Sequence, residues 1–189
     1  MKVVAINGSP NLGYTNYMVE QALDELKSRG IECEKIILND YKIGMCQGCP
    51  DCRTRQVCPV QDDGTWILEK YRTADGVIIS SPVWFHSINS HTKVFLDRSI
   101  FLNRHNMLPV AKCAGLIAIA GSSGADTAME ELMKFMVDQN KKPHSDCKIF
   151  TIAAYHGGLG RKPEEMVEVI EQARKMGQQM AETLTGIRS

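Results

Sequence analysis

The sequence carries no excess of charge of either sign, because Lys plus Arg and Asp plus Glu each number 22 among its 189 residues. A protein without net charge has no overall field to attract nucleic acid or an anionic membrane surface. Long hydrophobic runs are missing too, since no stretch approaches the roughly 20 apolar residues that a membrane-spanning helix needs. These two absences argue against nucleic-acid and membrane partners.

The first residues lack the features of a secretory signal. Residues 2–7 read Lys-Val-Val-Ala-Ile-Asn, a strand pattern where a signal peptide needs a longer, cleavable apolar segment. We therefore expect a cytoplasmic protein, in which thiols stay reduced and cysteine clusters bind metal more often than they form disulfides. The length favours a single domain over residues 1–189, with a substantial core.

Common nucleotide and metal motifs are also absent. The sequence has no GxGxxG fingerprint, and its five histidines show neither HExxH nor HxH spacing. Gly8 and Gly13 have the spacing of a P-loop, but Tyr14 stands where a P-loop has its lysine. Without that lysine nothing reaches the β- and γ-phosphates, which argues against nucleotide hydrolysis.

What the sequence does contain is a group of four cysteines within thirteen residues: Cys46, Cys49, Cys52 and Cys58. A disulfide between such close neighbours is strained unless it is a redox CxxC pair. Structural zinc usually takes two CxxC pairs separated by a longer spacer, whereas a compact CxxCxxC run is typical of [4Fe–4S] ligands. The pattern favours one [4Fe–4S] cluster, with zinc or free redox thiols as the alternatives.

Short apolar segments alternate with helical patterns along the chain, which is typical of an α/β fold. We expect a flavodoxin-like, doubly wound, five-stranded parallel sheet in the order 2-1-3-4-5. The one long irregular segment is a cysteine-rich loop after the second strand, at about residues 39–63, with Asp63 capping the next helix. The strands are expected at residues 2–7, 31–38, 76–80, 113–120 and 148–153.

The loop after the first strand has the composition of a phosphate site. Partial positive charge and free N–H groups at a helix start suit a phosphate monoester, such as that of a flavin. A plain turn between strand and helix is the alternative. The residues that we expect at this site are Ser9, Pro10, Thr15, Asn16 and Tyr17.

Two further loops end strands at the same expected edge, where such sheets bind ligands. Trp84 and Phe85 are costly to leave in water, and a planar ring would cover them. Backbone N–H groups of a Gly-Ser loop can bind the polar edge of that ring. Surface cover or a subunit contact is the alternative for both. The two loops consist of Pro82, Val83, Trp84 and Phe85, and of Gly121, Ser122, Ser123 and Gly124.

A few charged and aromatic residues have weaker signals. We expect Lys93 and Arg98 to lie on a solvated helix face, with Asp97 and Arg98 as an alternative subunit contact. Tyr155 and His156 follow the last strand, and there they could reach a ligand.

Several of these segments resemble the iron–sulfur flavoproteins of anaerobes, in the NADPH-dependent FMN reductase branch of the flavodoxin-like fold. The resemblance extends from the N-terminus to about residue 124. Its residues are Gly8-Ser9-Pro10, the four cysteines followed by Asp62-Asp63, Ser81-Pro82-Val83, and Leu96-Asp97-Arg98-Ser99.

The resemblance implies one FMN and one [4Fe–4S] cluster per subunit, in a homo-oligomer that is a dimer or a tetramer. It also implies electron exchange with ferredoxin or another small carrier, with NAD(P)H as a further candidate donor. By this resemblance the four cysteines look like cluster ligands. Ser9, Thr15 and Asn16 look like phosphate-loop positions, and residues 82–85 look like the isoalloxazine loop.

The expected function is that of an electron-transferring flavoprotein oxidoreductase. One alternative is a cluster-free, NAD(P)H-dependent FMN, quinone or nitro-compound reductase. The other is a carrier or a zinc-stabilised flavin-binding module with no turnover of its own.

Overall fold

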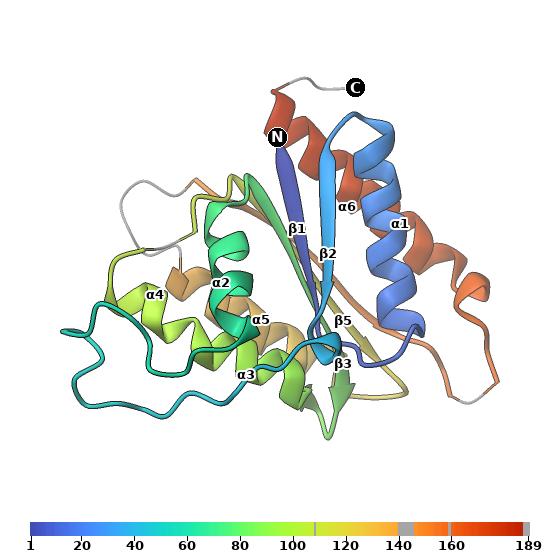
Figure 1. The fold of residues 1–189 in the computed structure, drawn as a ribbon. Coiled ribbons are helices and arrows are strands. Elements are labelled where there is room, and N and C mark those ends of the chain that lie inside the picture. The colour runs from blue at the N-terminus through green and yellow to red at the C-terminus, as the bar shows by residue number, and fades with distance from the viewer. Residues whose placement is uncertain (108, 140–145, 159, 187–189) are drawn as a thin grey trace.

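The computed structural model describes residues 1–107, 109–139, 146–158 and 160–186. At its centre is a sheet with the strand order β2-β1-β3-β5-β6, and a short β4 pairs with β3 (Figure 1). All neighbours along this path pair in parallel. The predicted doubly wound fold is therefore confirmed. When its five parallel strands are numbered along the chain without the short β4, their order is 2-1-3-4-5. The strands are Lys2–Asn7 (β1), Glu32–Ile37 (β2), Gly76–Trp84 (β3), Ser87–Ile88 (β4), Cys113–Ala120 (β5) and Lys148–Tyr155 (β6).

Helices cover both faces of the sheet (Figure 1). One face packs against α1 (Tyr14–Ser28) and α6 (Val167–Thr185). The other packs against α2 (Asp63–Thr73), α3 (Ser90–Arg98) and α5 (Ala125–Gln139). The shorter elements are α4 (Ile100–Arg104) and the 3₁₀ helices Leu38–Asp40 and Pro163–Glu165.

The strand sequences follow from this two-sided burial. In β1, Val3 and Ala5 face the core beneath α1 and α6, whereas Val4 and Ile6 face the opposite core. Since both faces are covered, the strand is an apolar run without alternation. Every residue of β5 is buried for the same reason.

Several boundaries differ from those predicted, including both ends of β2 and the end of β6. Asp62, not Asp63, caps α2, because its Oδ1 accepts from the Gly64 N–H at 2.9 Å. The third strand continues past residue 80 to Trp84, where the chain turns back into β4. The helix expected to carry Lys93 and Arg98 ends at Arg98, and Ser99 separates it, as α3, from the short α4.

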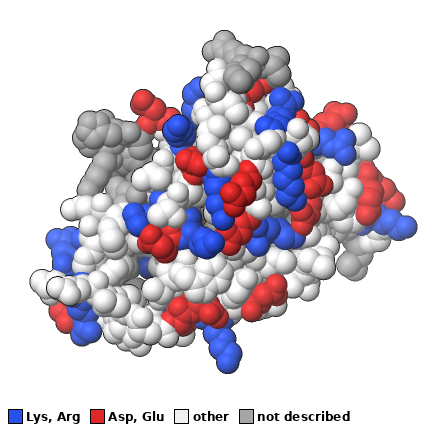
Figure 2. Space-filling model, turned by 45° about the horizontal axis from the view of Figure 1, so that its top comes forward, with Lys and Arg blue, Asp and Glu red and all other residues white. Residues whose placement is uncertain are grey.

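The surface reflects the balanced composition. Figure 2 shows Lys and Arg beside Asp and Glu over the face that it displays. At the β2 edge, Glu34 Oε2 pairs with Lys2 Nζ at 2.6 Å and with Lys70 Nζ at 3.0 Å. Within the described ranges, no helix is both long and apolar enough to cross a membrane.

Candidate functional site

The loops predicted to bind a flavin lie together at the carboxyl edge of the sheet, at the bottom of Figure 1. The register pairs Asn7 with Ser80 and Pro82 with Ile119, and so joins β1, β3 and β5 near this edge. Parallel strands in register bring the loops that follow them to the same place.

The loop after β1 turns tightly against β3 and α3. Its Gly8 N–H donates to the Ser80 carbonyl at 2.9 Å, and the Ser9 N–H donates to Asn7 Oδ1 at 3.0 Å. A Cβ at Gly8 would lie 1.9 Å from Thr92 Oγ1 and 3.0 Å from the Ser80 oxygen. Only glycine fits this position, because any side chain would push the loop off β3.

The N-terminus of α1 leaves several donors free. It has no side-chain cap and no acidic residue in its first turn, so its first N–H groups lack intrahelical partners. The Thr15 side chain is buried in the first turn of the helix. Such a terminus favours an anion.

Asn16 is already engaged within the protein through its side-chain oxygen. Its Oδ1 accepts from Asn7 Nδ2 at 3.1 Å and from Lys35 Nζ at 2.9 Å. Lys35 also pairs with Glu20. Sequence reasoning missed both Asn7 and Lys35, because Lys35 comes from the neighbouring strand β2 and only the fold brings it to α1.

The segment predicted as a flavin loop is a β-hairpin. Trp84 ends β3, and it pairs with Ser87 of β4 across the two-residue turn Phe85-His86. Phe85 and His86 have φ angles of 51° and 63°, as the two central residues of a type I′ turn require. The hairpin presents Phe85 fully exposed and Trp84 46% exposed at the sheet edge.

The loop after β5 packs directly against this hairpin. Gly124 has a φ of 85°, and a Cβ there would lie 2.6 Å from His86 Cα. Ser123 Oγ lies 3.5 Å from His86 Nε2. Two of the predicted flavin loops are thus in contact with each other.

Tyr155 and His156 complete the same edge from β6. The Tyr155 hydroxyl donates to Asp126 Oδ1 at 3.1 Å. His156 stacks on Tyr14, at the start of α1, with ring centroids 4.1 Å apart. Both side chains have partners within the protein, and they connect the last strand to α5 and α1.

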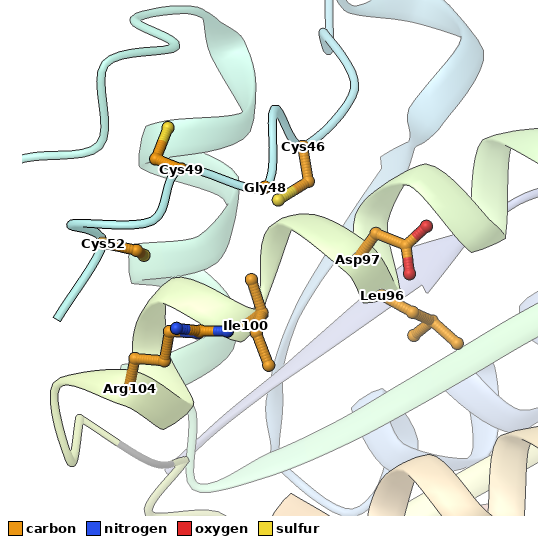
Figure 3. Close-up of a pocket in the computed structure, with 8 residues that line it drawn as sticks. All are labelled: Cys46, Gly48, Cys49, Cys52, Leu96, Asp97, Ile100 and Arg104. Carbon is orange, nitrogen blue, oxygen red and sulfur yellow. The ribbon is translucent and has the colours of Figure 1, made fainter.

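Three of the four grouped cysteines line one pocket of about 400 Å³ (Figure 3). Cys46, Cys49 and Cys52 lie on its loop side, and Cys58 is not part of the lining. The part of the chain that the structure describes contains no group of three His, Cys, Asp or Glu side chains placed to hold a metal ion. The three cysteines therefore line one side of the pocket, and their thiols do not converge on one point. Its other wall comes from α3 and α4 and consists of Leu96, Asp97, Ile100 and Arg104.

The cysteine loop is attached at its stem to a buried arginine. Arg98 is 2% exposed, and its Nη1 donates to the Gly44 carbonyl at 2.9 Å and to Asp62 Oδ2 at 2.8 Å. Its Nη2 donates to the Val60 carbonyl at 2.9 Å. The prediction of a solvated Arg98 was therefore wrong, whereas Lys93 is exposed and pairs with Asp97.

The carboxylate of Asp62 is held in its ionised form. Burial opposes ionisation, but the hydrogen bonds from Arg98 and from the Gly44 and Gly64 N–H groups outweigh it and lower the pKa of Asp62. A second attachment lies nearer the cysteines, where His105 Nε2 is 2.8 Å from the Cys52 carbonyl oxygen.

Two cysteines outside the loop, Cys33 and Cys113, have thiols with raised pKa values. Burial raises the pKa of Cys33 to about 11 and that of Cys113 to about 12. Both thiols stay protonated at neutral pH and are poor metal ligands. Cys147 is half-buried just before β6.

Comparisons with known proteins agree with this architecture. The family model described as NADPH-dependent FMN reductase matches residues 1–157. An iron-sulfur flavoprotein of Methanocaldococcus jannaschii is 34% identical over 97% of each chain. Another, of Archaeoglobus fulgidus, is 29% identical over 96% of this chain and 94% of its own.

A solved structure gives the same fold. The NAD(P)H:quinone oxidoreductase from Methanothermobacter marburgensis superposes with a TM-score of 0.71, over 94% of this chain and 95% of that one, at 16% identity. At that identity the likeness establishes the flavodoxin-like fold alone. The family match and the identity to the archaeal relatives go further. Together they show that the chain belongs to the NADPH-dependent FMN reductase family, among its iron-sulfur flavoproteins, and is an FMN-dependent oxidoreductase.

Proposed function

We propose that this oxidoreductase moves electrons between FMN at the carboxyl edge of the sheet and a [4Fe–4S] cluster held by Cys46, Cys49, Cys52 and Cys58. Ferredoxin or another small carrier exchanges electrons with the protein. FMN handles electrons singly or in pairs, and the cluster handles them one at a time. The observation that carries the proposal is the pocket lined by three of the four cysteines. This pocket lies beside α3, the helix that also holds the loop after β1 at the carboxyl edge of the sheet, which we call the flavin edge.

The phosphate of FMN fits the N-terminus of α1. The uncapped N–H groups and the Thr15 hydroxyl supply donors, and the helix end supplies partial positive charge. Lys35 adds a cation one hydrogen bond away from Asn16. Ser9 contributes less to phosphate binding than its position in the sequence suggested, because its hydroxyl already donates to the Asn11 carbonyl at 2.8 Å.

The isoalloxazine ring fits the surface formed by the hairpin and the loop after β5. Trp84 and Phe85 offer exposed aromatic faces, against which a planar ring loses its contact with water. We assign the backbone N–H groups of Gly121, Ser122 and Ser123, in the loop that contacts the hairpin, to the polar edge of the ring.

The donor set of the cysteine loop suits an iron–sulfur cluster. Four thiols lie within thirteen residues, and the pocket wall opposite three of them combines apolar Leu96 and Ile100 with the charged side chains of Asp97 and Arg104. Most hydrogen bonds between Met45 and Pro59 are local, such as Cys52 N–H to the Cys49 carbonyl at 3.2 Å. The loop can therefore close around the pocket without breaking the sheet or the helices.

The separation of the thiols in the cysteine loop favours one other candidate function. A cluster-free, NAD(P)H-dependent FMN or quinone reductase needs no metal-binding group, and none is formed by the described residues. Metal analysis of anaerobically purified protein separates the two functions. We expect about four iron and about four sulfide per FMN. Zinc, or FMN without metal and rapidly reduced by NADPH alone, would contradict the proposal.

Replacement of Thr15 by valine tests the phosphate site. We expect the affinity for FMN to fall roughly ten- to hundredfold, because one hydrogen bond to a charged group is lost. Riboflavin is the matched control, since it carries the ring but no phosphate, and its affinity should change little. Quenching of flavin fluorescence measures both. Equal losses for the two flavins would show that Thr15 does not contact the phosphate.

A further inference from the structure

Helix α3 contacts the flavin edge at its N-terminus. Asn89 caps the helix, with its Oδ1 accepting from the Thr92 N–H at 3.1 Å. The same side chain donates through Nδ2 to the Gly8 carbonyl at 2.7 Å, and the Asn89 N–H donates to Ser81 Oγ at 3.0 Å. All of these groups are buried. The first turn of α3 thereby fixes the loop after β1.

The opposite end of α3 contacts the cysteine loop. Arg98 is the last residue of the helix, and it bonds to both stems of that loop: Gly44 on the incoming stem, and Val60 and Asp62 on the outgoing one. Asp62 Oδ2 also accepts from the Gly44 N–H at 2.6 Å. These contacts join segments 36 to 54 residues from Arg98 in sequence.

The chemistry of Arg98 explains why it favours one arrangement of the two stems of the cysteine loop. A buried guanidinium is stable only with a carboxylate and further acceptors in good geometry. Arg98 Nε has no partner among the described residues, so the charge depends on the three acceptors in the stems. Lysine could not replace it, because an ammonium group lacks the planar fork that reaches both stems at once.

The length of α3 sets the distance between the two attachments. Nine residues span about 13 Å at 1.5 Å per residue. The helix is held to the core by Phe95, whose ring meets that of Tyr71 edge-on at 5.3 Å. One short, well-packed helix therefore connects the two loops to which the proposed function assigns the cofactors.

We propose that Arg98 is a positioning residue: it closes the two stems of the cysteine loop on the C-terminal end of α3, and so sets where the cysteines lie relative to the flavin edge. The closing of the stems does not depend on the proposed function. The consequence for a metal centre does rest on it, and the experiment therefore has two arms.

The first arm uses the full-length, metal-free protein and measures amide hydrogen exchange. Arg98→Met and Arg98→Lys should speed exchange in the stems, at Gly44 and Asp63, roughly ten- to hundredfold. Exchange within α1 and β5 should stay unchanged, which shows that the variants fold. Lys93→Met is the matched control, because Lys93 lies on the same helix and is exposed. Asp62→Asn, which keeps a good helix cap, should reproduce the effect if an arginine variant does not fold.

The second arm uses protein that contains iron and measures the rate of iron loss to a chelator. Both Arg98 variants should lose iron at least about tenfold faster than Lys93→Met, while FMN stays bound. Unchanged stem exchange would overturn the proposal, and so would full rescue by lysine, because charge alone would then suffice. Faster stem exchange with an unchanged iron-loss rate would overturn the positioning role. A wild-type protein without iron would contradict the proposed function, and the first arm would still decide whether Arg98 closes the stems.

Discussion

Serine at Cys46, Cys49, Cys52 or Cys58 is expected to remove most of the iron while FMN stays bound. A [4Fe–4S] cluster takes four thiolates, and a serine hydroxyl is a poor substitute at neutral pH. The flavin is expected to stay because α1 and the hairpin are built from other parts of the chain. Iron, acid-labile sulfide and visible absorbance, measured anaerobically on each variant, give the result.

Cys33→Ser is the matched control for this series. Its thiol lies in β2 and stays protonated, because burial raises its pKa to about 11, so this variant should keep its iron. Cys58→Ser is the most informative of the four variants, because Cys58 does not line the pocket that the other three cysteines share. If all four variants kept the full iron content, the cluster assignment would fail.

Replacement of Tyr71 by alanine is expected to lower the free energy of unfolding by about 3–5 kcal/mol. Tyr71 is fully buried between α2 and the sheet, and its ring contacts Phe95 and Phe135. Total stabilities are only about 5–15 kcal/mol, so this variant should be largely unfolded at moderate urea. Urea denaturation followed by circular dichroism measures the change.

Tyr71→Phe separates the ring from the hydroxyl. The hydroxyl donates to the weak acceptor Met136 Sδ, at 3.7 Å, so its removal should cost less than about 1 kcal/mol. Burial raises the pKa of Tyr71, so the phenol stays protonated over the working pH range. A phenylalanine variant as unstable as the alanine variant would show that the hydroxyl, not the packing, stabilises this core.

The sheet could be predicted from the sequence because its strands are buried on both faces. Residues 2–7 and 113–120 are short apolar runs, and each is followed directly by a glycine that begins a turn. The loop after β1 was recognisable for a related reason, since Gly8 is required by the close approach of Thr92. Here local sequence and tertiary contacts point to the same structure.

The hairpin and the arginine could not be predicted in the same way. Type I′ turns favour Asn-Gly, and Phe85-His86 carries no such signal. The burial of Arg98 depends on Asp62, which lies 36 residues earlier, and on two carbonyl groups that no side-chain pattern reveals. The cysteine spacing predicted a shared site, but whether Cys58 joins the other three depends on the path of an exposed loop.

The two edges of the sheet differ in their resistance to aggregation. Edge strands can pair with strands of other molecules unless charges discourage it. β2 carries Glu32, Glu34 and Lys35 along its six residues. At the opposite edge, β6 begins with Lys148 and then continues with seven uncharged residues. Association of partly unfolded chains should therefore start at β6, at the opposite end of the strand order from β2.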